Sequence, residues 1–433
     1  MAGKKIGIVL ALDGEKEFRQ GMSNARKESQ MMKSEINKLS AEYEGNANSL
    51  EYLRKKQEAL EKQTKSYESQ IKSASAGLKN AESVQKRAAA RYEELKTEVE
   101  KEGMVLGASS HRAEHYWFFN GGRQILEADV NDPEYADLYG PVAGITRDMS
   151  DIYDNPPSEG HMQDWLVRTC EIVDKYHPSI VYFDWWIQQY AWKPYLRKFA
   201  AYYYNRSAQW GKETAIDAKF DAYVYGSAVN DLERGQLDHI TPDLWQNDTS
   251  VAKNSWGYTI GNDYKKPSDV VLDLIDVVSK NGALLLNIGP KPDGTIPEED
   301  AHILREMGKW LKVNGEAIYG TRYWKVFGEG PTVVPEGHFT DTYDKHFTSE
   351  DIRFTSKSNH IYATVLHWPE DGEIHIKSLG NDMKLLKSTI RDIEILGTDL
   401  HPSYARNKEL DISCGRGAVD AGDMPVVLKI TIE

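Results

Sequence analysis

Apolar residues recur with a seven-residue period through the first hundred positions of the chain. The apolar members of the two series are Met32, Leu39, Leu53, Leu60 and Tyr67 in one, and Ile36, Leu50 and Ile71 in the other. Lys, Glu, Gln and Ser fill most positions between them, which is the pattern of a coiled coil or a long helical hairpin. A turn is expected at residues 45–49, with Asn48 and Glu51 capping the second helix.

The pattern changes after Gly103 to short apolar runs that alternate with helical periodicity. Strands are expected at 104–109, 180–184, 214–218, 226–231 and 283–288, with a further Trp-containing strand at 244–246. Helices are expected at 162–176, 194–209, 268–281 and 298–314. Strands that alternate with helices predict βα units and a parallel sheet, so the fold class is α/β.

Beyond Trp324 the apolar residues alternate over short stretches such as 360–366, 373–378 and 426–432. Such alternation is typical of a small antiparallel β-sandwich. The sequence therefore predicts three regions. Residues 1–103 form a helical coiled coil, residues 104–325 form part of a (β/α)₈ barrel, and residues 326–433 form a C-terminal β-sandwich.

Composition supports this division and limits the partners. All 11 Trp and all 16 Pro lie beyond residue 103, and that second part carries a formal net charge of −17 against +3 for residues 1–103. An acidic chain is a poor partner for nucleic acid, which needs clustered Lys and Arg. The two cysteines, Cys170 and Cys414, predict neither a disulfide framework nor a thiolate metal site. The apolar run from Ile6 to Leu12 is too short for a secretory or membrane segment, so we expect a cytoplasmic protein without a membrane partner.

The predicted strand 180–184 ends in a carboxylate, in the run Tyr182-Phe183-Asp184-Trp185-Trp186. In a (β/α)₈ barrel the catalytic groups stand at the carboxyl ends of the strands. A buried Asp between aromatic rings is costly unless it has partners or a task. The alternative is that Asp184 caps the next helix or accepts hydrogen bonds from loop amides.

A second carboxylate lies beyond the strand at 226–231, in the run Asn230-Asp231-Leu232-Glu233. Two carboxylates from strand ends, with many aromatic residues nearby, favour a glycosidase, because glycoside hydrolysis needs one nucleophile or base and one acid. Sugar rings also have apolar faces that pack on Trp and Tyr. Each of these aromatic residues has a core position as its alternative. They are Tyr116, Trp117, Phe118, Phe119, Trp185, Trp186, Trp245 and Trp256.

The densest polar cluster follows the first predicted strand and contains His111, Arg112, Glu114 and His115. These side chains suit the binding of sugar hydroxyls. A zinc site would require the His-x-x-x-His pair on a helix with a third ligand and a base, and the adjoining aromatic run argues against that. We therefore predict no metal and no cofactor. The predicted sugar-binding residues are His111, His115, Trp117, Trp185, Trp186, Trp245 and Trp256.

Three stretches resemble bacterial family 29 α-L-fucosidases: VLGASSHRAEHYWFFNGGRQ near residue 105, VSKNGALLLNIGPKPDGTIPEED at 278–300 and GKWLKVNGEAIYGTRYW at 308–324. The resemblance covers residues 104–433. It implies a retaining exo-glycosidase that releases terminal α-L-fucose from a fucosylated oligosaccharide or glycoside. It also implies that Asp184 is the nucleophile and Glu233 the acid/base. Gln246 stands where some relatives place a Glu, so Glu114 is the reserve acid.

One departure from the family pattern affects the expected activity. The family's barrel begins with three βα units that carry His-Trp-Gly, Trp and His-His motifs, and none of these precedes Met104 here. Residues 1–103 instead resemble the N-terminal region of phage tail tape-measure proteins. We therefore expect an N-terminally truncated fucosidase of low activity. Two alternatives remain: a coiled-coil structural protein with an inactive fucosidase remnant, and a homo-oligomer joined through the coiled coil or through barrel completion by a neighbouring chain.

Overall fold

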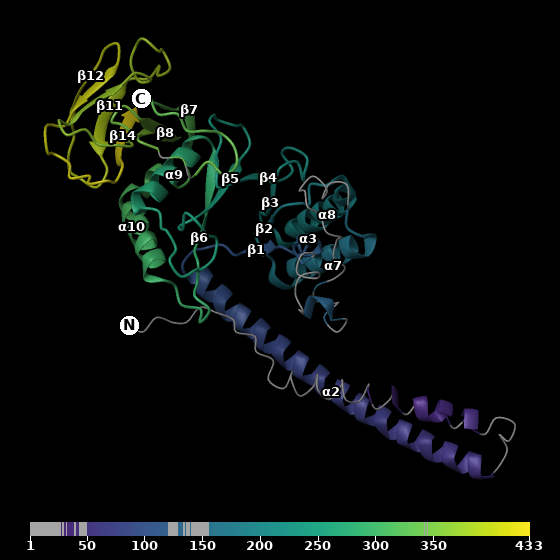
Figure 1. Ribbon diagram of the computed structural model, residues 1–433. Coiled ribbons are helices and arrows are strands. Elements are labelled where there is room, and N and C mark those ends of the chain that lie inside the picture. Colours follow the sequence, from purple (N-terminus) through teal and green to yellow (C-terminus); the bar gives the residue numbers. More distant parts are fainter. Residues whose placement is uncertain are drawn as a thin grey trace. The chain divides into compact units, whose positions relative to one another are not determined.

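The computed structural model describes residues 27, 30–31, 33–38, 40–42, 50–119, 129–132, 135, 139, 156–341, 343 and 345–433 (Figure 1). The chain divides into two compact units, Met1–Val105 and Leu106–Glu433. The predicted turn at 45–49 and the apolar run at 6–12 lie outside the described residues. Among the described helices, none is both long enough and apolar enough to cross a bilayer.

A single helix of 52 residues, α2 (Leu50–Lys101), dominates the first unit (Figure 1). The helix ends next to Gly103, a residue that favours helix termination. Gly103 has φ +69°, the left-handed conformation that glycine adopts most easily. The Gly103 amide donates to the Glu100 carbonyl (3.0 Å) and the Met104 amide donates to the Val99 carbonyl (3.1 Å), which together form a Schellman C-cap.

The buried positions of α2 repeat every seven residues, but in a register one residue away from the predicted one. Tyr52, Ala59 and Ser66 are 6%, 5% and 5% exposed. Leu53, Leu60 and Tyr67, from the predicted series, are 51%, 45% and 47% exposed. Lys56, Gln63 and Gln70 are half-buried between the buried positions, which gives the alternating three- and four-residue spacing of a helical seam. The predicted register is therefore wrong, because small and polar residues occupy this seam while the leucines face away from it.

The second unit contains a parallel sheet of six strands in sequence order, β1-β2-β3-β4-β5-β6. The strands are β1 (Gly107–Ser110), β2 (Ile180–Phe183), β3 (Ala215–Lys219), β4 (Val229–Glu233), β5 (Trp245–Ser250) and β6 (Gly282–Asn287). Sequential parallel order is the arrangement of a (β/α)₈ barrel, of which this sheet represents a part. Within the described residues β1 and β6 are the two edges of this sheet.

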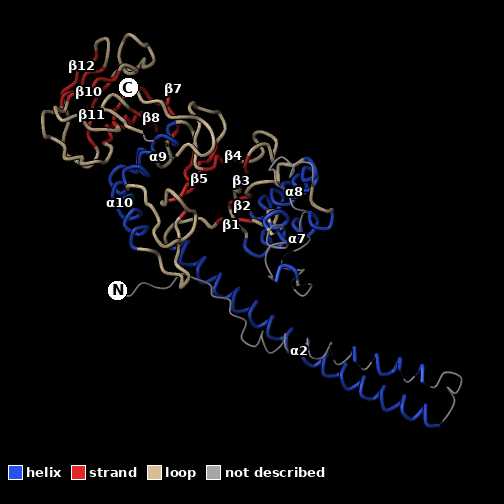
Figure 2. The backbone as a smooth tube through the Cα atoms, viewed as in Figure 1, coloured by secondary structure: helices blue, strands red, loops and turns tan. Residues whose placement is uncertain are grey.

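Helices connect these strands, as the tube in Figure 2 shows. Those between β1 and β3 are α3 (His115–Phe118), α7 (Glu159–Tyr176) and α8 (Lys193–Trp210), and those on either side of β6 are α9 (Pro267–Ser279) and α10 (Glu298–Asn314). Among the described residues, the short 3-10 helices are η1 (Asp129–Asn131), η3 (Tyr190–Trp192) and η4 (Gly315–Ala317). The four long predicted helices are confirmed within three residues at each end.

Side chains alternate between the two faces of the sheet, and this alternation separates core from site. Val181 and Phe183 of β2 and Ile216 of β3 share one core cluster with Trp165 of α7 and Phe199 of α8. The intervening residues face the other way, since successive side chains of a strand point to opposite faces. Those residues are polar: Tyr182, Asp217, Lys219, Asp231, Glu233, Gln246 and Asp248.

The C-terminal region holds two antiparallel sheets, of order β10-β13-β12 and β11-β14-β9-β8-β7. The strands are β7 (Arg322–Glu329), β8 (Ile352–Lys357), β9 (His360–Val365), β10 (Glu373–Ile376), β11 (Ile390–Ile395), β12 (Ser403–Arg406), β13 (Leu410–Ser413) and β14 (Val426–Ile432). Ile374 of the first sheet and Phe354 of the second belong to the same hydrophobic cluster. The predicted boundary between residues 325 and 326 falls inside β7, which pairs with β8.

Candidate active site

Lys219 is the centre of a cluster of charged side chains at the carboxyl end of the sheet. It is the last residue of β3, its side chain is 1% exposed, and four carboxylates surround its ammonium. The distances from Nζ are 2.8 Å to Asp231 Oδ2, 3.0 Å to Asp248 Oδ2, 3.4 Å to Glu233 Oε2 and 3.8 Å to Asp184 Oδ1. A buried cation is stable only when paired, so the position of Lys219 fixes those of the carboxylates.

Strand register explains why these residues meet. Lys219 lies opposite Asp231, which lies opposite Gln246, and Glu233 lies opposite Asp248. Gln246 Nε2 donates to Asp231 Oδ1 (2.8 Å), so the amide at this position supports a buried carboxylate. In-register parallel strands thus stack the polar residues of one strand beside those of the next.

Asp184 follows β2 and is the most accessible of the carboxylates around Lys219, with a side chain 22% exposed. Its Oδ2 lies 3.5 Å from His111 Nδ1, a residue that follows β1. The hydrogen bond to Asp184 raises the pKa of His111 and outweighs burial, which lowers it. Asp184 therefore lies between the Lys219 ammonium and the His111 imidazole, one on each carboxylate oxygen.

Glu233, the last residue of β4, is the second carboxylate at this end of the sheet, and its side chain is 11% exposed. The Trp185 indole N–H donates to Glu233 Oε2. Burial raises the pKa of Glu233, while the Lys219 charge and the Trp185 hydrogen bond lower it. A carboxyl whose pKa is raised by burial but which remains accessible suits a general acid.

Asp184 and Glu233 share one neighbour, which limits how far apart they lie. Because both carboxylates approach the same ammonium nitrogen at 3.8 and 3.4 Å, their nearest oxygens are separated by less than about 8 Å. Both stand at the carboxyl end of the sheet, one after β2 and the other at the end of β4. The prediction that they share one open end of the sheet agrees with this geometry.

Glu114 lies in the turn before α3 and is completely buried. Neither of its carboxyl oxygens has a hydrogen-bond partner. Burial raises the pKa of Glu114 to about 8. A carboxyl closed off from solvent has no path to a leaving group, so accessibility favours Glu233 over Glu114 as the acid.

Two further carboxyls near Lys219, those of Asp217 and Asp248, have raised pKa values. Burial, reinforced by the charge of Asp231, raises the pKa of Asp217 to about 8. Burial and Asp231 also raise the pKa of Asp248 to about 7, against the opposing effect of Lys219. The Tyr182 hydroxyl donates to Asp248 Oδ2 (3.3 Å). Several carboxyls around a single ammonium thus disfavour full ionisation of the cluster.

The structure brings some predicted sugar-binding residues to this end of the sheet and not others. His111 and Trp185 contact Asp184 and Glu233, respectively. His115 lies within 3.1 Å of an Arg112 nitrogen, and Arg112 in turn pairs with Asp164 at 2.9 Å. His115 therefore belongs to a polar group one step away from the two carboxylates.

Four of the predicted tryptophans occupy other environments. Trp117 and Trp186 are 4% and 7% exposed and lie 5.2 Å apart in the core cluster of the helices. Trp245, 2% exposed, begins β5 and donates to the Lys280 carbonyl, at the opposite end of that strand from the carboxylates. Trp256 is 38% exposed, and the Arg234 guanidinium covers its ring at 4.4 Å.

Sequence reasoning missed Lys219, His338 and Phe339. Lys219 carries a local signal, because Asp217 and Lys219 are polar residues two apart in an otherwise apolar strand. His338 and Phe339 carry none, since they lie in the connection after β7 and reach the site only through tertiary structure. The Glu233 amide donates to His338 Nδ1 (3.0 Å), and the Phe339 amide donates to the Glu233 carbonyl (2.8 Å).

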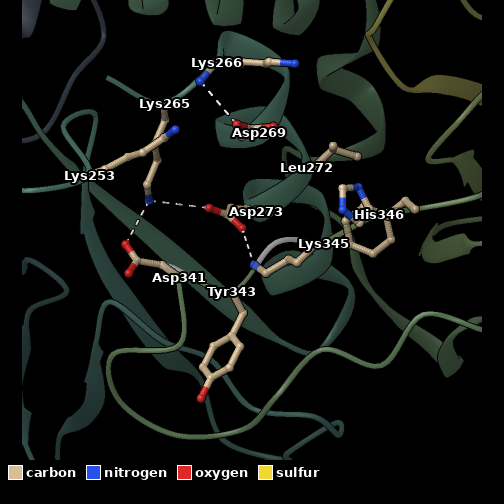
Figure 3. A pocket seen from close by; sticks show the side chains of 11 residues that line it. Lys253, Lys265, Lys266, Asp269, Leu272, Asp273, Asp341, Tyr343, Lys345 and His346 are labelled. Atoms are coloured by element: carbon tan, nitrogen blue, oxygen red, sulfur yellow. Dashed lines mark hydrogen bonds and ion pairs between the residues drawn. The ribbon is translucent and has the colours of Figure 1, made fainter. Parts of the chain in front are cut away.

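A hollow of about 370 Å³, separate from the carboxylates around Lys219, lies next to this connection. Its lining contains several lysines that pair with carboxylates (Figure 3). Lys265 approaches Asp341 at 3.0 Å and Asp273 at 3.7 Å, while Lys345 approaches Asp273 at 2.7 Å. Asp341 Oδ2 also accepts hydrogen bonds from Arg234 (3.2 Å) and Thr249 (2.8 Å). These pairs anchor residues 337–341 beside the end of β4.

The described residues offer one group at the site with the donor types of a metal centre. One ligand atom each of His111, Glu114 and Asp184 lies within 4.8 Å of the others. Asp184 also approaches Lys219, so a cation there would face the lysine charge. The pair of carboxylates, Asp184 and Glu233, fits the geometry of this site better than a metal centre does.

Comparison with known proteins agrees with this geometry. A family model described as "Alpha-L-fucosidase" matches residues 72–316, and one described as "Alpha-L-fucosidase C-terminal domain" matches residues 344–431. The first match begins within α2, earlier than the start of the resemblance expected at residue 104.

Individual relatives point the same way. The chain is 34% identical to the plasma alpha-L-fucosidase of Pongo abelii over 244 residues, which covers 54% of this chain and 47% of that protein. It is 29% identical to an alpha-L-fucosidase of Branchiostoma floridae, covering 57% of each. A Thermotoga maritima alpha-fucosidase solved in complex with fucose matches with a TM-score of 0.52 and 27% identity, over 66% of this chain and 60% of that one. The chain thus spans about half the length of the first curated relatives it matches.

Proposed function

Because the chain belongs to the alpha-L-fucosidase family, we propose that it hydrolyses terminal α-L-fucosyl residues of oligosaccharides or glycosides with retention of configuration. The observation that carries the proposal is the pair Asp184 and Glu233 around Lys219 at one end of the parallel sheet. One carboxylate is accessible beside the Lys219 ammonium and the His111 imidazole, and the other is a partly buried acid. This is the division of roles that glycoside hydrolysis by double displacement requires.

In the first step, an Asp184 oxygen forms a bond to the anomeric carbon of fucose as the glycosidic carbon–oxygen bond breaks. Glu233 gives its proton to the departing oxygen, so the leaving group departs as a neutral alcohol. The result is a covalent fucosyl ester of Asp184 and an ionised Glu233. The neighbouring Lys219 ammonium stabilises the charge that Glu233 acquires.

In the second step, Glu233 takes a proton from water, and the water oxygen attacks the anomeric carbon. The ester bond to Asp184 breaks and the carboxylate is regenerated, as is the protonated Glu233. His111 contacts the oxygen of Asp184 that does not face Lys219. It therefore orients the carboxylate for attack while it also adds positive charge.

The test replaces the nucleophile. Asp184→Ala is expected to lower turnover of an aryl α-L-fucoside by at least about 10³-fold, because the covalent intermediate cannot form. Azide is expected to restore part of the turnover and to yield a fucosyl azide of inverted configuration. Asp243→Ala, which removes an exposed carboxylate on the loop before β5, is the matched control and should retain wild-type turnover. Wild-type turnover by Asp184→Ala would refute the assignment.

The alternative of a coiled-coil structural protein lacks an observation in its favour, since both family models that match describe alpha-L-fucosidases. The resemblance of residues 1–103 to tail tape-measure proteins stays a prediction, and so does a cytoplasmic location. We propose that oligomers, where they form, join through α2 or through the edges of the parallel sheet.

A further inference from the structure

Four rings form a cluster that adjoins the candidate acid through Trp185 and His338: Trp185, Phe220, His338 and Phe339, here called the aromatic rim. The Trp185 ring lies 5.0 Å from Phe220, 6.1 Å from His338 and 6.0 Å from Phe339, and the Phe220 and His338 rings are 4.6 Å apart. The Trp185 and Phe339 planes differ by only 20°. The indole N–H of Trp185 donates to Glu233, so the rim is joined directly to the acid.

Two members of the rim are exposed. Phe220 is 41% exposed and Phe339 is 50% exposed. Both are large apolar side chains held beside a polar site, where neither contributes a fully buried surface to the core. Exposed aromatic rings that gather at a site, rather than scattering singly, indicate a surface for binding.

The backbone at the rim is strained. Phe220 has φ +53° and Phe339 has φ +58°, and Arg234, next to Glu233, has φ +46°. Non-glycine residues rarely adopt this left-handed region, and they persist there only when the surrounding structure holds them. Such strain gathers at functional sites because it places a side chain where an unstrained backbone would not.

A ladder of hydrogen bonds holds the strained segment on the end of β4. The Gly337 amide donates to the Gln236 carbonyl (3.0 Å), and the Asp341 amide donates to the Arg234 carbonyl (2.8 Å). The Phe339 amide donates to the Glu233 carbonyl between them. Gly235 allows this approach, because a Cβ there would lie 1.7 Å from the Gly337 carbonyl oxygen. The rim is therefore preformed rather than dependent on a ligand.

We propose that the aromatic rim is the binding site for the leaving group of the substrate, and that it selects leaving groups with a ring that has an apolar face. This inference rests on the proposed function. The acid of a retaining glycosidase gives its proton to the oxygen of the leaving group, so the groups around Glu233 face that part of the substrate. Asp184 and His111 lie on the fucose side. An aryl ring or the apolar face of a pyranose would pack on Phe220 and Phe339.

The test compares three substrates that share fucose and differ in the leaving group. α-L-Fucosyl fluoride has a single-atom leaving group, 4-nitrophenyl α-L-fucoside has an aryl ring, and a fucosylated lactose has a sugar. For Phe339→Ala and Phe220→Ala, kcat/KM is expected to fall about tenfold on the substrates with rings. On the fluoride it should stay within about threefold of wild type. Phe339→Tyr, which keeps the ring, should behave as wild type.

Tyr343→Ala is the matched control, since Tyr343 is 62% exposed in the same connection but lines the separate lysine-rich hollow. Loss on the aryl substrate alone would assign the rim to aryl leaving groups, and loss on the lactose substrate alone would assign it to sugars. Equal losses on all three substrates, or none on either ring substrate, would overturn the proposal. Wild-type protein that leaves the fluoride intact would instead refute the proposed function.

A binding measurement separates the two ideas without turnover. In saturation-transfer NMR with 4-nitrophenyl α-L-thiofucoside, the aryl protons should receive saturation from the wild-type protein and lose most of it with Phe339→Ala. The fucosyl protons should retain theirs. Saturation of the aryl protons that is unchanged in Phe339→Ala would overturn the rim as the leaving-group site. Thermal unfolding of each variant confirms that it is folded.

Discussion

At the scale of single residues, the environments of Asp184 and Glu233 differ in the way that the roles proposed for them require. Asp184 meets His111 on one oxygen and Lys219 on the other, while Glu233 meets Lys219 and the indole N–H of Trp185. The difference lies in burial, since the Asp184 side chain is 22% exposed and that of Glu233 is 11% exposed. Burial raises the pKa of Glu233 and prepares it to hold a proton.

Trp185→Phe tests this role of the indole. The indole hydrogen bond favours ionised Glu233, so its loss should raise the pKa of Glu233 further. A general acid stops working when it loses its proton, so the alkaline limb of the kcat/KM profile should move to higher pH. Trp210→Phe, at the far end of α8, should leave the profile in place. An alkaline limb that moves to lower pH in Trp185→Phe would contradict the assignment of Glu233.

Lys219→Met tests the centre of the cluster. Burial disfavours the Lys219 ammonium, but Asp231 and Asp248 outweigh it and raise the pKa of this lysine, so it stays charged through neutral pH. Its loss should cost about 3–5 kcal/mol, the usual penalty for breaking a buried ion pair. It should also raise the folded-state pKa of Asp217, Asp248 and Glu233, because Lys219 lowers all three.

The sign of the pH dependence follows from these shifts. A carboxyl whose pKa is higher in the folded than in the unfolded state stabilises the fold at low pH and loses that contribution as pH rises through the folded-state value. The melting temperature of Lys219→Met should therefore fall further below that of wild type between pH 5 and about pH 8. Lys309→Met, which removes a lysine with a 72% exposed side chain, should show no such trend.

The place of a site residue could be predicted where the signal lies within a short stretch of sequence. Asp184 and Glu233 follow recognisable strands, so their shared end of the sheet was accessible to sequence reasoning. Trp245 shows the limit of that reasoning. Its strand was recognised, but the residue begins β5 instead of ending it, which places it in the core. Phe339 shows a second limit, because only the hydrogen bonds between two distant segments bring it to Glu233.

At the scale of elements, the spacing of the apolar residues by itself predicts the wrong buried face for α2. Leucine is the residue that a seam usually prefers, so the sequence favours the series with Leu53 and Leu60. The structure instead buries Tyr52, Ala59 and Ser66. Helix and strand positions were predicted better, and α10 and β14 have the expected bounds, because their periodicity is uninterrupted and their ends are marked. The strand β4 extends two residues beyond its predicted end, to Glu233.

A pair of neighbouring substitutions distinguishes the two registers of α2. Ala59→Glu puts a charge into a buried position and should lower the midpoint of thermal helix loss, measured by circular dichroism, by several degrees. Leu60→Glu changes a residue that is 45% exposed and should have little effect. The opposite ranking of the two variants would restore the predicted register.

At the scale of the whole molecule, the chain passes from the first unit to the second through a short exposed stretch. Residues 100–105 are all exposed, and α2 ends there at Lys101. We expect limited trypsin digestion to cut after Lys101 first and to leave a resistant fragment that begins near Glu102, detectable by mass spectrometry. Lys101→Gln should delay that fragment. Protection of this stretch in the wild-type chain would mean that the helix end is covered in solution.

The connection that carries His338 and Phe339 has a meaning for how such enzymes diversify. Residues 317–343 lie between the two family-model matches, so His338 and Phe339 come from a stretch that neither model describes, whereas Trp185 and Phe220 lie within the first match. On the proposed roles, one half of the leaving-group site is thereby encoded apart from the nucleophile and the acid. Drift in this connection alone would retune which glycans are cleaved while the nucleophile and acid stay fixed. Grafting it between relatives would transfer the preference of one enzyme to another.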